Sequence, residues 1–431
     1  MRKLIRVPSP LMKAKLSISG QTQLFENFGF SSSIIGPKGG DISGYIFPGI
    51  ACTDEVKGLI SQDAPVAIGI SGGKDSGAAA LATVQYLDQM GHKGPRLLIH
   101  SDLGRVEWEQ SIRICERLAQ QLGLELVVVQ WKQGDMIDRW RKRWQDNTVR
   151  YANLDLVKLL LPWSTSGMRF CTSELKTSII SQYLTTRFPG QTILSVTGIR
   201  RQESSERQKK PVASWSNDLS RTPRNSPPTG GMNWNPIIEW KHTDVWALHH
   251  KYNLPIHEAY TQHNMSRVSC AYCILAGQTD LLNATTYTGN RLAFSLLVDL
   301  EIESSFSFKD GHWLADIKPA WLSETQQADL VKAKRRNKER ERIEAAIPAH
   351  LLYEKGWPVV MPTQAEARLL ASVRNQIAAL LELSIRYTEP DTILDRYQFL
   401  MAEKARKKAQ QYESGVTDGQ PASEPITSLF V

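Results

Sequence analysis

Hydrophobic residues in the first two thirds of the chain form short runs separated by longer segments of helical character. The first run, residues 66–70, reads Val-Ala-Ile-Gly-Ile and is followed by a glycine turn. Comparable runs cover residues 97–102, 124–130 and 192–198. Such runs are typical of buried strands, and residues 77–90 and 107–122 between them fit helices. The alternation predicts an α/β fold, a doubly wound and mostly parallel sheet with helices on both faces.

The same patterning divides the chain into four parts. We predict an N-terminal extension over residues 1–60, an α/β domain over 61–275, a helical C-terminal region over 276–412 and a disordered tail over 413–431. One segment inside the α/β domain, residues 211–235, is rich in Ser, Asn and Pro. Its composition predicts a loop outside the packed sheet, either a mobile lid over a site or a disordered surface insertion.

Composition adds limits on class and location. The 431 residues are 41% hydrophobic, enough for a large core and a second smaller one. No apolar run approaches the roughly 20 residues that cross a bilayer, and no apolar block of signal-peptide length follows Met1, so we expect a cytoplasmic protein. The net charge of +8 is mild for this length. Basic clusters at 332–342 and 404–408 fit either a polyanionic partner or solvated helices.

The most informative motif is Ser71-Gly-Gly-Lys-Asp-Ser76, which lies between the first predicted strand and the first predicted helix. At that junction, backbone N–H groups and the positive end of a helix can bind phosphate. Glycines let the backbone approach the anion, the serines supply hydroxyl groups, and Lys74 adds a positive charge. Asp75 would repel phosphate unless it holds a cation or braces the loop. The spacing of the glycines and the lysine excludes a Walker A loop. The alternative to a phosphate-binding loop is a Gly-Ser turn with incidental charge.

The loop resembles the SGGxDS signature of PP-loop proteins, and its context resembles the phosphoadenosine phosphosulfate (PAPS) reductase family. This resemblance covers residues 64–275 and implies an adenine nucleotide alpha hydrolase-like fold. It further implies that Ser71, Gly72, Gly73, Lys74 and Ser76 bind the phosphates of ATP or PAPS. Lys74 and Asp75 are the candidate catalytic residues.

Further nucleotide contacts follow from strand ends and from the resemblance. Asp102 ends the second strand, where a carboxylate could accept from a ribose hydroxyl or hold Mg²⁺, the alternative being a turn residue. Residues 197–207 are similar to the family's Gly-x-Arg-x-x-Glu-Ser-x-x-Arg stretch. The resemblance implies that Gly198, Arg200, Glu203 and Arg207 contact nucleotide or substrate, and guanidinium groups suit phosphate and sulfate oxygens.

Three of the five cysteines form a candidate metal site. Cys270 and Cys273 have the spacing that presents two thiolates to one metal, and Cys171 is a third ligand by resemblance to iron-sulfur members of the family. Those members use a cysteine pair where this chain has Phe170 beside Cys171, so three ligands are implied and one position stays open. The resemblance favours a 4Fe-4S cluster. The alternatives are zinc completed by His257 or His263, or plain buried thiols, and Cys52 and Cys115 are expected to be structural.

The expected function is that of an enzyme. We predict cleavage of ATP to AMP and pyrophosphate with Mg²⁺, which activates a substrate for sulfur transfer from a sulfur-donor protein to an acceptor such as a nucleic acid. One alternative is a sulfonucleotide reductase that releases sulfite. Reductases of the family that this chain resembles carry a nucleophilic cysteine near the C-terminus, whereas no cysteine follows Cys273 here. The other alternative is a non-catalytic protein that senses a nucleotide.

Overall fold

The computed structural model describes residues 36–40, 42–220 and 227–413. The predicted tail after residue 413 and most of the N-terminal extension lie outside these residues. The chain divides into two compact units, Met1–Asp135 with Phe170–Asn290, and Met136–Arg169 with Arg291–Val431. Residues 136–169 thus group with the C-terminal helices rather than with the α/β unit that surrounds them in sequence, and the four-part division above stays a prediction.

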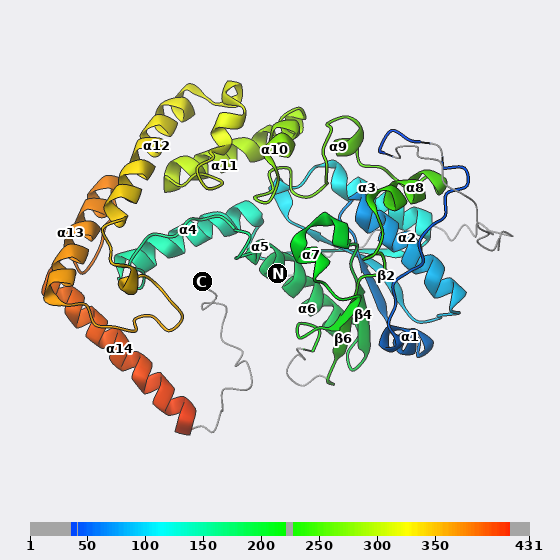
Figure 1. The fold of residues 1–431 in the computed structure, drawn as a ribbon, viewed down its shortest axis with the longest axis horizontal. Helices are drawn as coiled ribbons and strands as arrows, with labels where there is room; N and C mark the ends of the chain where they lie inside the picture. The colour runs from blue at the N-terminus through cyan, green and yellow to red at the C-terminus, as the bar shows by residue number, and fades with distance from the viewer. Residues whose placement is uncertain (1–35, 41, 221–226, 414–431) are drawn as a thin grey trace, which may run out of the picture. The chain divides into compact units, whose positions relative to one another are not determined.

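The first unit contains a six-stranded sheet with the order β3-β2-β1-β4-β6-β5 (Figure 1). All neighbouring strands pair in parallel except β5, which runs antiparallel to β6. This arrangement confirms the predicted α/β fold with a mostly parallel sheet. The strands are β1 Val66–Gly69, β2 Arg96–Asp102, β3 Glu125–Gln130, β4 Thr192–Val196, β5 Ala213–Trp215 and β6 Gly230–Trp234.

Helices cover both faces of the sheet, as the sequence predicts for a doubly wound fold. One face, with Ile68 and Val196, packs against α1 Asp54–Ser61, α2 Lys74–Gln89, α3 Gln110–Leu122 and α8 His242–Lys251. The other face, with Ala67 and Ile193, packs against α6 Ser178–Arg187. Successive strand residues point to opposite faces, which is why neighbours such as Ala67 and Ile68 belong to different clusters.

Local sequence explains where the helices near the site begin and end. Helix α2 buries a row of alanines, residues 78–80, and these small side chains let it lie close to the sheet and to α8. Helix α3 ends at Gly123, whose φ of 65° is a left-handed conformation that glycine adopts without strain. Helix α2 begins at Lys74, three residues earlier than the apolar pattern predicts, so the phosphate-loop motif itself starts the helix.

The prediction that residues 211–235 lie outside the packed sheet was wrong. The segment supplies β5 and β6, and Met232 and Trp234 of β6 are buried in the core. The many Ser, Gly and Pro residues hid a five-residue strand in which Gly231, Met232 and Trp234 are buried. Strand β5 lies at the edge of the sheet, where Trp215 is exposed and a short strand is tolerated. Residues 221–226 are outside the described part of the chain.

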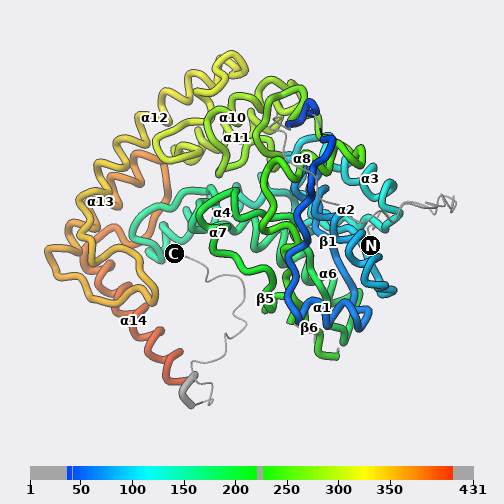
Figure 2. Tube along the Cα trace, turned by 45° about the vertical axis from the view of Figure 1, so that its right-hand side comes forward, coloured from blue at the N-terminus to red at the C-terminus, as the bar shows by residue number. Residues whose placement is uncertain are grey.

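The second unit is helical, in agreement with the predicted helical region. Its long helices are α4 Met136–Ala152, α11 Arg291–Ser304, α12 Glu324–Glu344, α13 Gln364–Leu381 and α14 Pro390–Glu413 (Figure 2). Aromatic side chains form part of its core: the ring centroid of Trp163 lies 5.6 Å from that of Trp140 and 5.0 Å from that of Phe308. Among the described helices of either unit, none is both long enough and apolar enough to cross a membrane.

Candidate functional site

The predicted phosphate-binding residues gather where the order of the sheet changes direction. The chain proceeds from β1 to β2 and β3 on one side, whereas β4 pairs with β1 on the other side. Ligands in doubly wound sheets bind at the carboxyl ends of the strands beside such a switch point. Ser71–Ser76 follows β1 and Gly198 follows β4, so both motifs lie at this point.

The loop is closed by its own side chains and by glycine geometry. The hydroxyl of Ser76 donates to the carbonyl of Gly73 at 2.8 Å and accepts from the N–H of Ser71 at 3.2 Å. Gly72 has φ of +74°, and a Cβ there would lie 3.0 Å from the carbonyl oxygen of Ser111. The conformation therefore requires glycine at position 72.

Backbone donors at the loop are left free to bind an anion. The N–H groups of Gly72, Gly73, Asp75 and Ser76 have no hydrogen-bond partner within the described part of the chain. They stand at the start of α2, a helix of 16 residues whose N-terminal end carries partial positive charge. Unpaired N–H groups at a helix start are the feature by which proteins bind phosphate.

Asp75 lies between two buried cations and braces the loop. One carboxylate oxygen is 3.1 Å from Nζ of Lys74 and the other is 2.5 Å from Nε of Arg200. Both cationic side chains are only 4% exposed. Burial by itself raises the pKa of Asp75, but Lys74 and Arg200 outweigh it, so the pKa is lower than that of a free aspartate. Of the two roles that the sequence left open, the structure shows the bracing one.

Gly198 allows the end of β4 to approach the loop. A Cβ on this residue would lie 2.5 Å from the backbone carbonyl oxygen of Asp75 and 2.8 Å from Cα of Ser76. Real Cβ atoms do not come this close to backbone, so only glycine fits. Arg200, two residues later, reaches Asp75 from the same strand end.

The other residues predicted to contact nucleotide or substrate are held in place by hydrogen bonds and ion pairs to neighbouring residues. Asp102 accepts the N–H of Gly104 at 2.7 Å, so it closes the turn after β2. The carboxylate of Glu203 accepts the backbone N–H of Arg200 at 2.8 Å and forms an ion pair with Arg207. Their roles in binding nucleotide stay predictions.

Two residues that the sequence analysis did not single out contact the loop directly. The hydroxyl of Tyr260 accepts the backbone N–H of Lys74 at 3.2 Å, and Nε2 of His249 lies 2.8 Å from the carbonyl oxygen of Lys74. Both side chains are buried. They come from α8 and from α9 Glu258–Thr261, more than 170 residues along the chain, and no spacing pattern in the sequence reports so distant a contact.

The buried histidine gives a testable pH dependence. Burial lowers the pKa of His249 to about 4, against about 6.5 for an unfolded histidine, so the unfolded chain takes up a proton first as the pH falls. Stability is therefore lost between pH 6.5 and pH 4. We expect His249→Gln to reduce the drop in unfolding free energy between pH 7 and pH 5 by about 2 kcal/mol, measured by urea titration. The exposed His312→Gln is the control, and equal drops in both variants would contradict the assignment.

The three predicted cysteine ligands come from two segments and interact electrostatically. Cys171 belongs to α5 Phe170–Thr172. Cys270 and Cys273 lie in a turn, and the backbone of Cys270 forms an isolated antiparallel β-bridge with that of Glu107. Burial raises the pKa of the Cys270 thiol, Lys176 acts to lower it, and Cys273, Glu107 and Cys171 add to the rise. The pKa of Cys270 thus responds to the charge of both other thiols.

The described residues nevertheless contain no group of three His, Cys, Asp or Glu side chains arranged to hold a metal ion. Both ring nitrogens of His257 are engaged, by Ser111 at 3.3 Å and by the N–H of Ala259 at 3.0 Å. Nδ1 of His263 lies 2.7 Å from the hydroxyl of Thr286. Among the described residues, neither the three cysteines nor a set completed by one of these histidines is arranged as a metal site. What the residues offer is three thiols, the donor set of a cluster with an open position.

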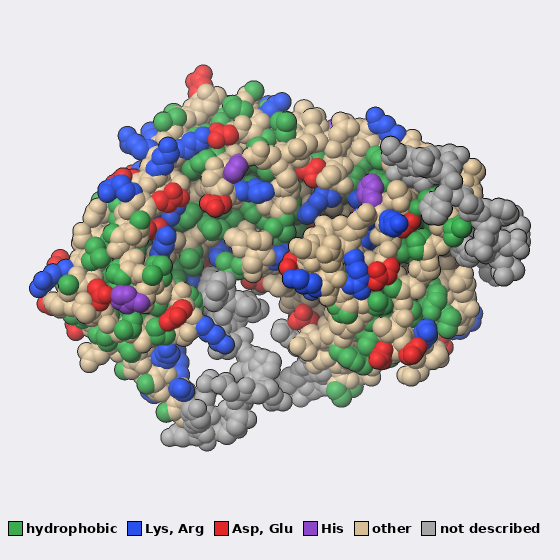
Figure 3. All heavy atoms as spheres, viewed as in Figure 1, with side chains coloured by type: hydrophobic (Ala, Val, Ile, Leu, Met, Phe, Trp, Pro, Cys, Tyr) green, Lys and Arg blue, Asp and Glu red, His purple; other side chains and the backbone are tan. Residues whose placement is uncertain are grey.

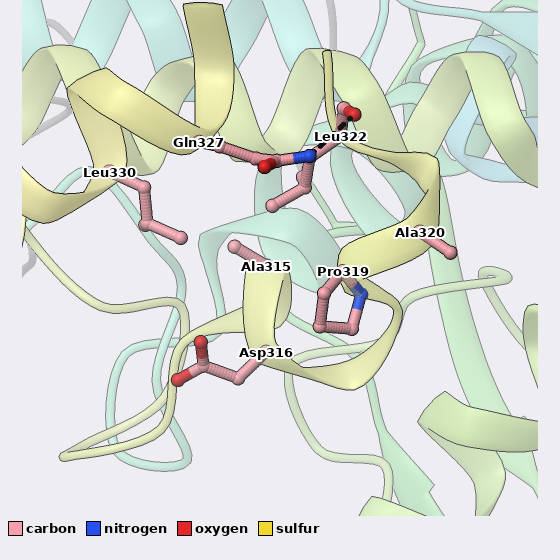
Figure 4. A pocket seen from close by; sticks show the side chains of 7 residues that line it. All are labelled: Ala315, Asp316, Pro319, Ala320, Leu322, Gln327 and Leu330. Atoms are coloured by element: carbon pink, nitrogen blue, oxygen red, sulfur yellow. Dashed lines mark hydrogen bonds between the residues drawn. The ribbon is translucent and has the colours of Figure 1, made fainter. Parts of the chain in front are cut away.

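A hollow of about 410 Å³ in the second unit is not the site of this chemistry (Figure 4). Its walls include Ala315, Pro319 and Leu330, and the one carboxylate among its lining residues, Asp316, is paired with Lys334 at 2.6 Å. It presents no nucleophile and no cluster of free donors. We place the site at the phosphate loop because hydrogen-bond geometry, buried charge and close glycine contacts coincide there.

The fold and the loop together are those of a PP-loop domain. Residues 65–276 match the phosphoadenosine phosphosulfate reductase domain. This part of the chain belongs to the PAPS reductase-like family of PP-loop proteins, which confirms the resemblance seen in the sequence.

Two relatives each match about half of the chain. An uncharacterized 37.8 kDa protein of Escherichia phage 186 is 26% identical over 213 residues, which are 48% of this chain and 60% of the relative. An uncharacterized protein of Methanocaldococcus jannaschii is 26% identical over 212 residues, 49% of this chain and 42% of the relative. The chain therefore matches less than two thirds of either protein.

Solved structures with similarity include PAPS reductase from Candida auris in a phosphate complex, at 13% identity and a TM-score of 0.31, covering 52% of this chain and 98% of that one. Another is the U34-tRNA thiolase NcsA from Methanococcus maripaludis with its [4Fe-4S] cluster, at 15% identity and a TM-score of 0.26, covering 62% of this chain and 84% of that one.

Proposed function

We propose that the chain is an enzyme that binds ATP at Ser71–Ser76 and cleaves it to AMP and pyrophosphate, which activates a substrate for sulfur transfer. The observation that carries the proposal is the set of unpaired N–H groups at the start of α2, held in place by Asp75 and the two buried cations that it pairs with, Lys74 and Arg200. A site of this kind suits the terminal phosphates of a nucleotide.

The chemistry divides into two balanced displacements. A substrate oxygen attacks the α-phosphorus of ATP, the bond from that phosphorus to the α,β-bridging oxygen breaks, and pyrophosphate leaves with the electron pair into the loop. The N–H groups and Lys74 stabilise the charge that develops on the leaving group. A sulfide-class nucleophile then attacks the adenylated carbon, and AMP leaves with the former substrate oxygen.

Mg²⁺ is expected to enter with the nucleotide. Proteins commonly hold this ion through substrate phosphates and one or two carboxylates. Both oxygens of Asp75 are already occupied by Lys74 and Arg200, so Asp75 acts by keeping the loop in shape. Asp102 uses one carboxylate oxygen to close its turn, so its other oxygen is the proposed contact for a metal or a ribose.

Cys171, Cys270 and Cys273 are proposed to hold a 4Fe-4S cluster. When bound, such a cluster supplies an open iron position for a sulfur ligand. The described cysteines are all free thiols, which fits a reducing cytoplasm as the proposed location.

Two other functions remain as alternatives to be tested. A sulfonucleotide reductase would release sulfite from PAPS, and a non-catalytic sensor would bind nucleotide without turnover. The proposed nucleic-acid partner has weak support from charge, because basic residues of α12 such as Lys332 and Arg342 pair with Asp329 and Glu339. Figure 3 likewise shows acidic and basic side chains interspersed on the face that it presents.

Lys74→Met tests the proposed step. We expect ATP-dependent pyrophosphate release, assayed with candidate nucleic acids and a sulfide donor, to fall by roughly 100-fold or more, because the variant loses the charge that faces the leaving group. The exposed Lys93→Met is the control and should keep its rate. Sulfite release from PAPS would favour the reductase, and nucleotide binding with neither product would favour the sensor.

A further inference from the structure

The hydroxyl of Tyr260 joins the phosphate loop to the segment that carries the cysteine pair. It accepts the backbone N–H of Lys74 at 3.2 Å and that of Val268 at 3.1 Å. A phenol oxygen has acceptor capacity for both bonds. Burial raises the pKa of Tyr260, and Asp75 adds to the rise, so the side chain stays neutral at physiological pH.

The two donors belong to different parts of the proposed site. Lys74 is in the loop, whereas Val268 lies two residues before Cys270. We call residues 266–273 the cysteine segment. Its first residue meets the loop a second time, because Nζ of Lys74 lies 3.4 Å from the carbonyl oxygen of Ser266.

The cysteine segment is fixed at two other points. The N–H and hydroxyl of Ser266 donate to the carboxylate of Asp280 at 2.9 and 2.7 Å. The N–H of Ala271 donates to the carbonyl of Val106 at 2.8 Å. Between these anchors, Val268 is joined to the loop through the hydroxyl of Tyr260.

Lys74 is placed to create such a shift. Its ammonium group contacts Asp75 and Ser266 and lies 5.1 Å from the ring centroid of Tyr260. A phosphate in the loop competes for this ammonium group, because charged oxygens bind it more strongly than a carbonyl does. Movement of Lys74 would displace its backbone N–H, and the Tyr260 hydroxyl that accepts this group also accepts the N–H of Val268.

We propose that Tyr260 is a positioning residue that couples occupancy of the phosphate loop to the conformation of the turn bearing Cys270 and Cys273. The inference rests on the proposed function, since it takes ATP as the ligand of the loop. In this proposal, the hydroxyl of Tyr260 determines where Cys270 and Cys273 lie relative to the bound nucleotide.

Hydrogen exchange of backbone amides, followed by mass spectrometry, tests the coupling in the full chain. Wild type is compared with Tyr260→Phe, with and without Mg-ATP, over peptides that cover 71–76 and 266–273. Without nucleotide, we expect exchange in both segments to be roughly three- to tenfold faster in Tyr260→Phe, the effect of losing hydrogen bonds of ordinary strength. Tyr183→Phe, on α6 against the core of Leu97 and Ile99, is the matched control and should exchange as wild type does.

The response to ATP separates coupling from a purely structural role. In wild type, Mg-ATP should slow exchange in both segments. In Tyr260→Phe it should slow exchange in the loop while the cysteine segment no longer responds. A cysteine segment that still responds in the variant, or unchanged exchange in the variant without nucleotide, overturns the inference. If wild-type residues 71–76 do not respond to ATP, the proposed function fails, and the nucleotide-free comparison alone then decides whether Tyr260 ties the two segments together.

Discussion

Asp75→Asn should lower the free energy of unfolding by about 3 kcal/mol, because it leaves two buried cations without their shared counter-charge. Lys74 and Arg200 are each 4% exposed and both contact the Asp75 carboxylate. Asparagine keeps the shape and one acceptor but removes the charge. The same change should abolish measurable ATP binding, since the loop loses the ion pairs that hold it against β4. Urea titration and calorimetry measure the two effects.

A matched control separates this buried site from an ordinary surface ion pair. Asp54 pairs with Lys57 at 3.1 Å on α1, and its side chain is 97% exposed. Asp54→Asn should change the free energy of unfolding by less than about 1 kcal/mol, because solvent screens exposed pairs. If the two variants are equally stable, the Asp75 carboxylate does not brace the loop.

The effect of Asp75 should also depend on pH. Its pKa in the folded protein is lower than the value of about 3.9 in an unfolded chain, because Lys74 and Arg200 outweigh the opposing effect of burial. The stabilisation is therefore fully present above about pH 4 and is lost as the pH falls through the folded pKa. The difference between wild type and Asp75→Asn should shrink below pH 4 and stay constant from pH 5 to pH 8.

Gly198→Ala is expected to produce the second large effect. The added methyl group would lie 2.5 Å from the Asp75 carbonyl oxygen and 2.8 Å from Cα of Ser76, so β4 or the loop must move. Overpacking of this kind costs about 1–3 kcal/mol. We also expect ATP affinity to fall at least roughly tenfold, because the free N–H groups move with the loop.

Gly230 offers a matched control on the neighbouring strand β6. A Cβ at this position would approach only the side chain of Thr192, at 3.6 Å, which is an ordinary contact. Gly230→Ala should therefore leave ATP affinity unchanged. Equal affinities in Gly198→Ala and Gly230→Ala would show that the end of β4 does not shape the nucleotide site.

The parts of the fold that the sequence predicted are those encoded by local patterns. The run at 66–70 and the glycine turn after it follow from apolar periodicity and from the dihedral freedom of Gly72. Strand β6 was missed because its two large hydrophobic residues, Met232 and Trp234, stand among glycines and polar residues. The pairing of such a strand is decided by its neighbours in space.

The site shows the same division between local and distant information. The motif predicted the loop, and the resemblance to the family stretch after the fourth strand pointed to Gly198 and Arg200. The sequence did not reveal that Asp75 pairs with Arg200, nor that Tyr260 and His249 hydrogen-bond to the backbone of Lys74. Each of these contacts joins residues more than 120 positions apart in the sequence. Only the path of the chain through the sheet brings them together.

Isothermal titration of Mg-ATP into the wild-type chain tests the central claim, that Ser71–Ser76 is a phosphate-binding loop of a nucleotide site. The account predicts saturable heat with one ATP bound per chain, with an affinity that falls at least roughly tenfold in Gly198→Ala and is unchanged in Gly230→Ala. Absence of heat with the wild type, or binding that Gly198→Ala leaves intact, would contradict it.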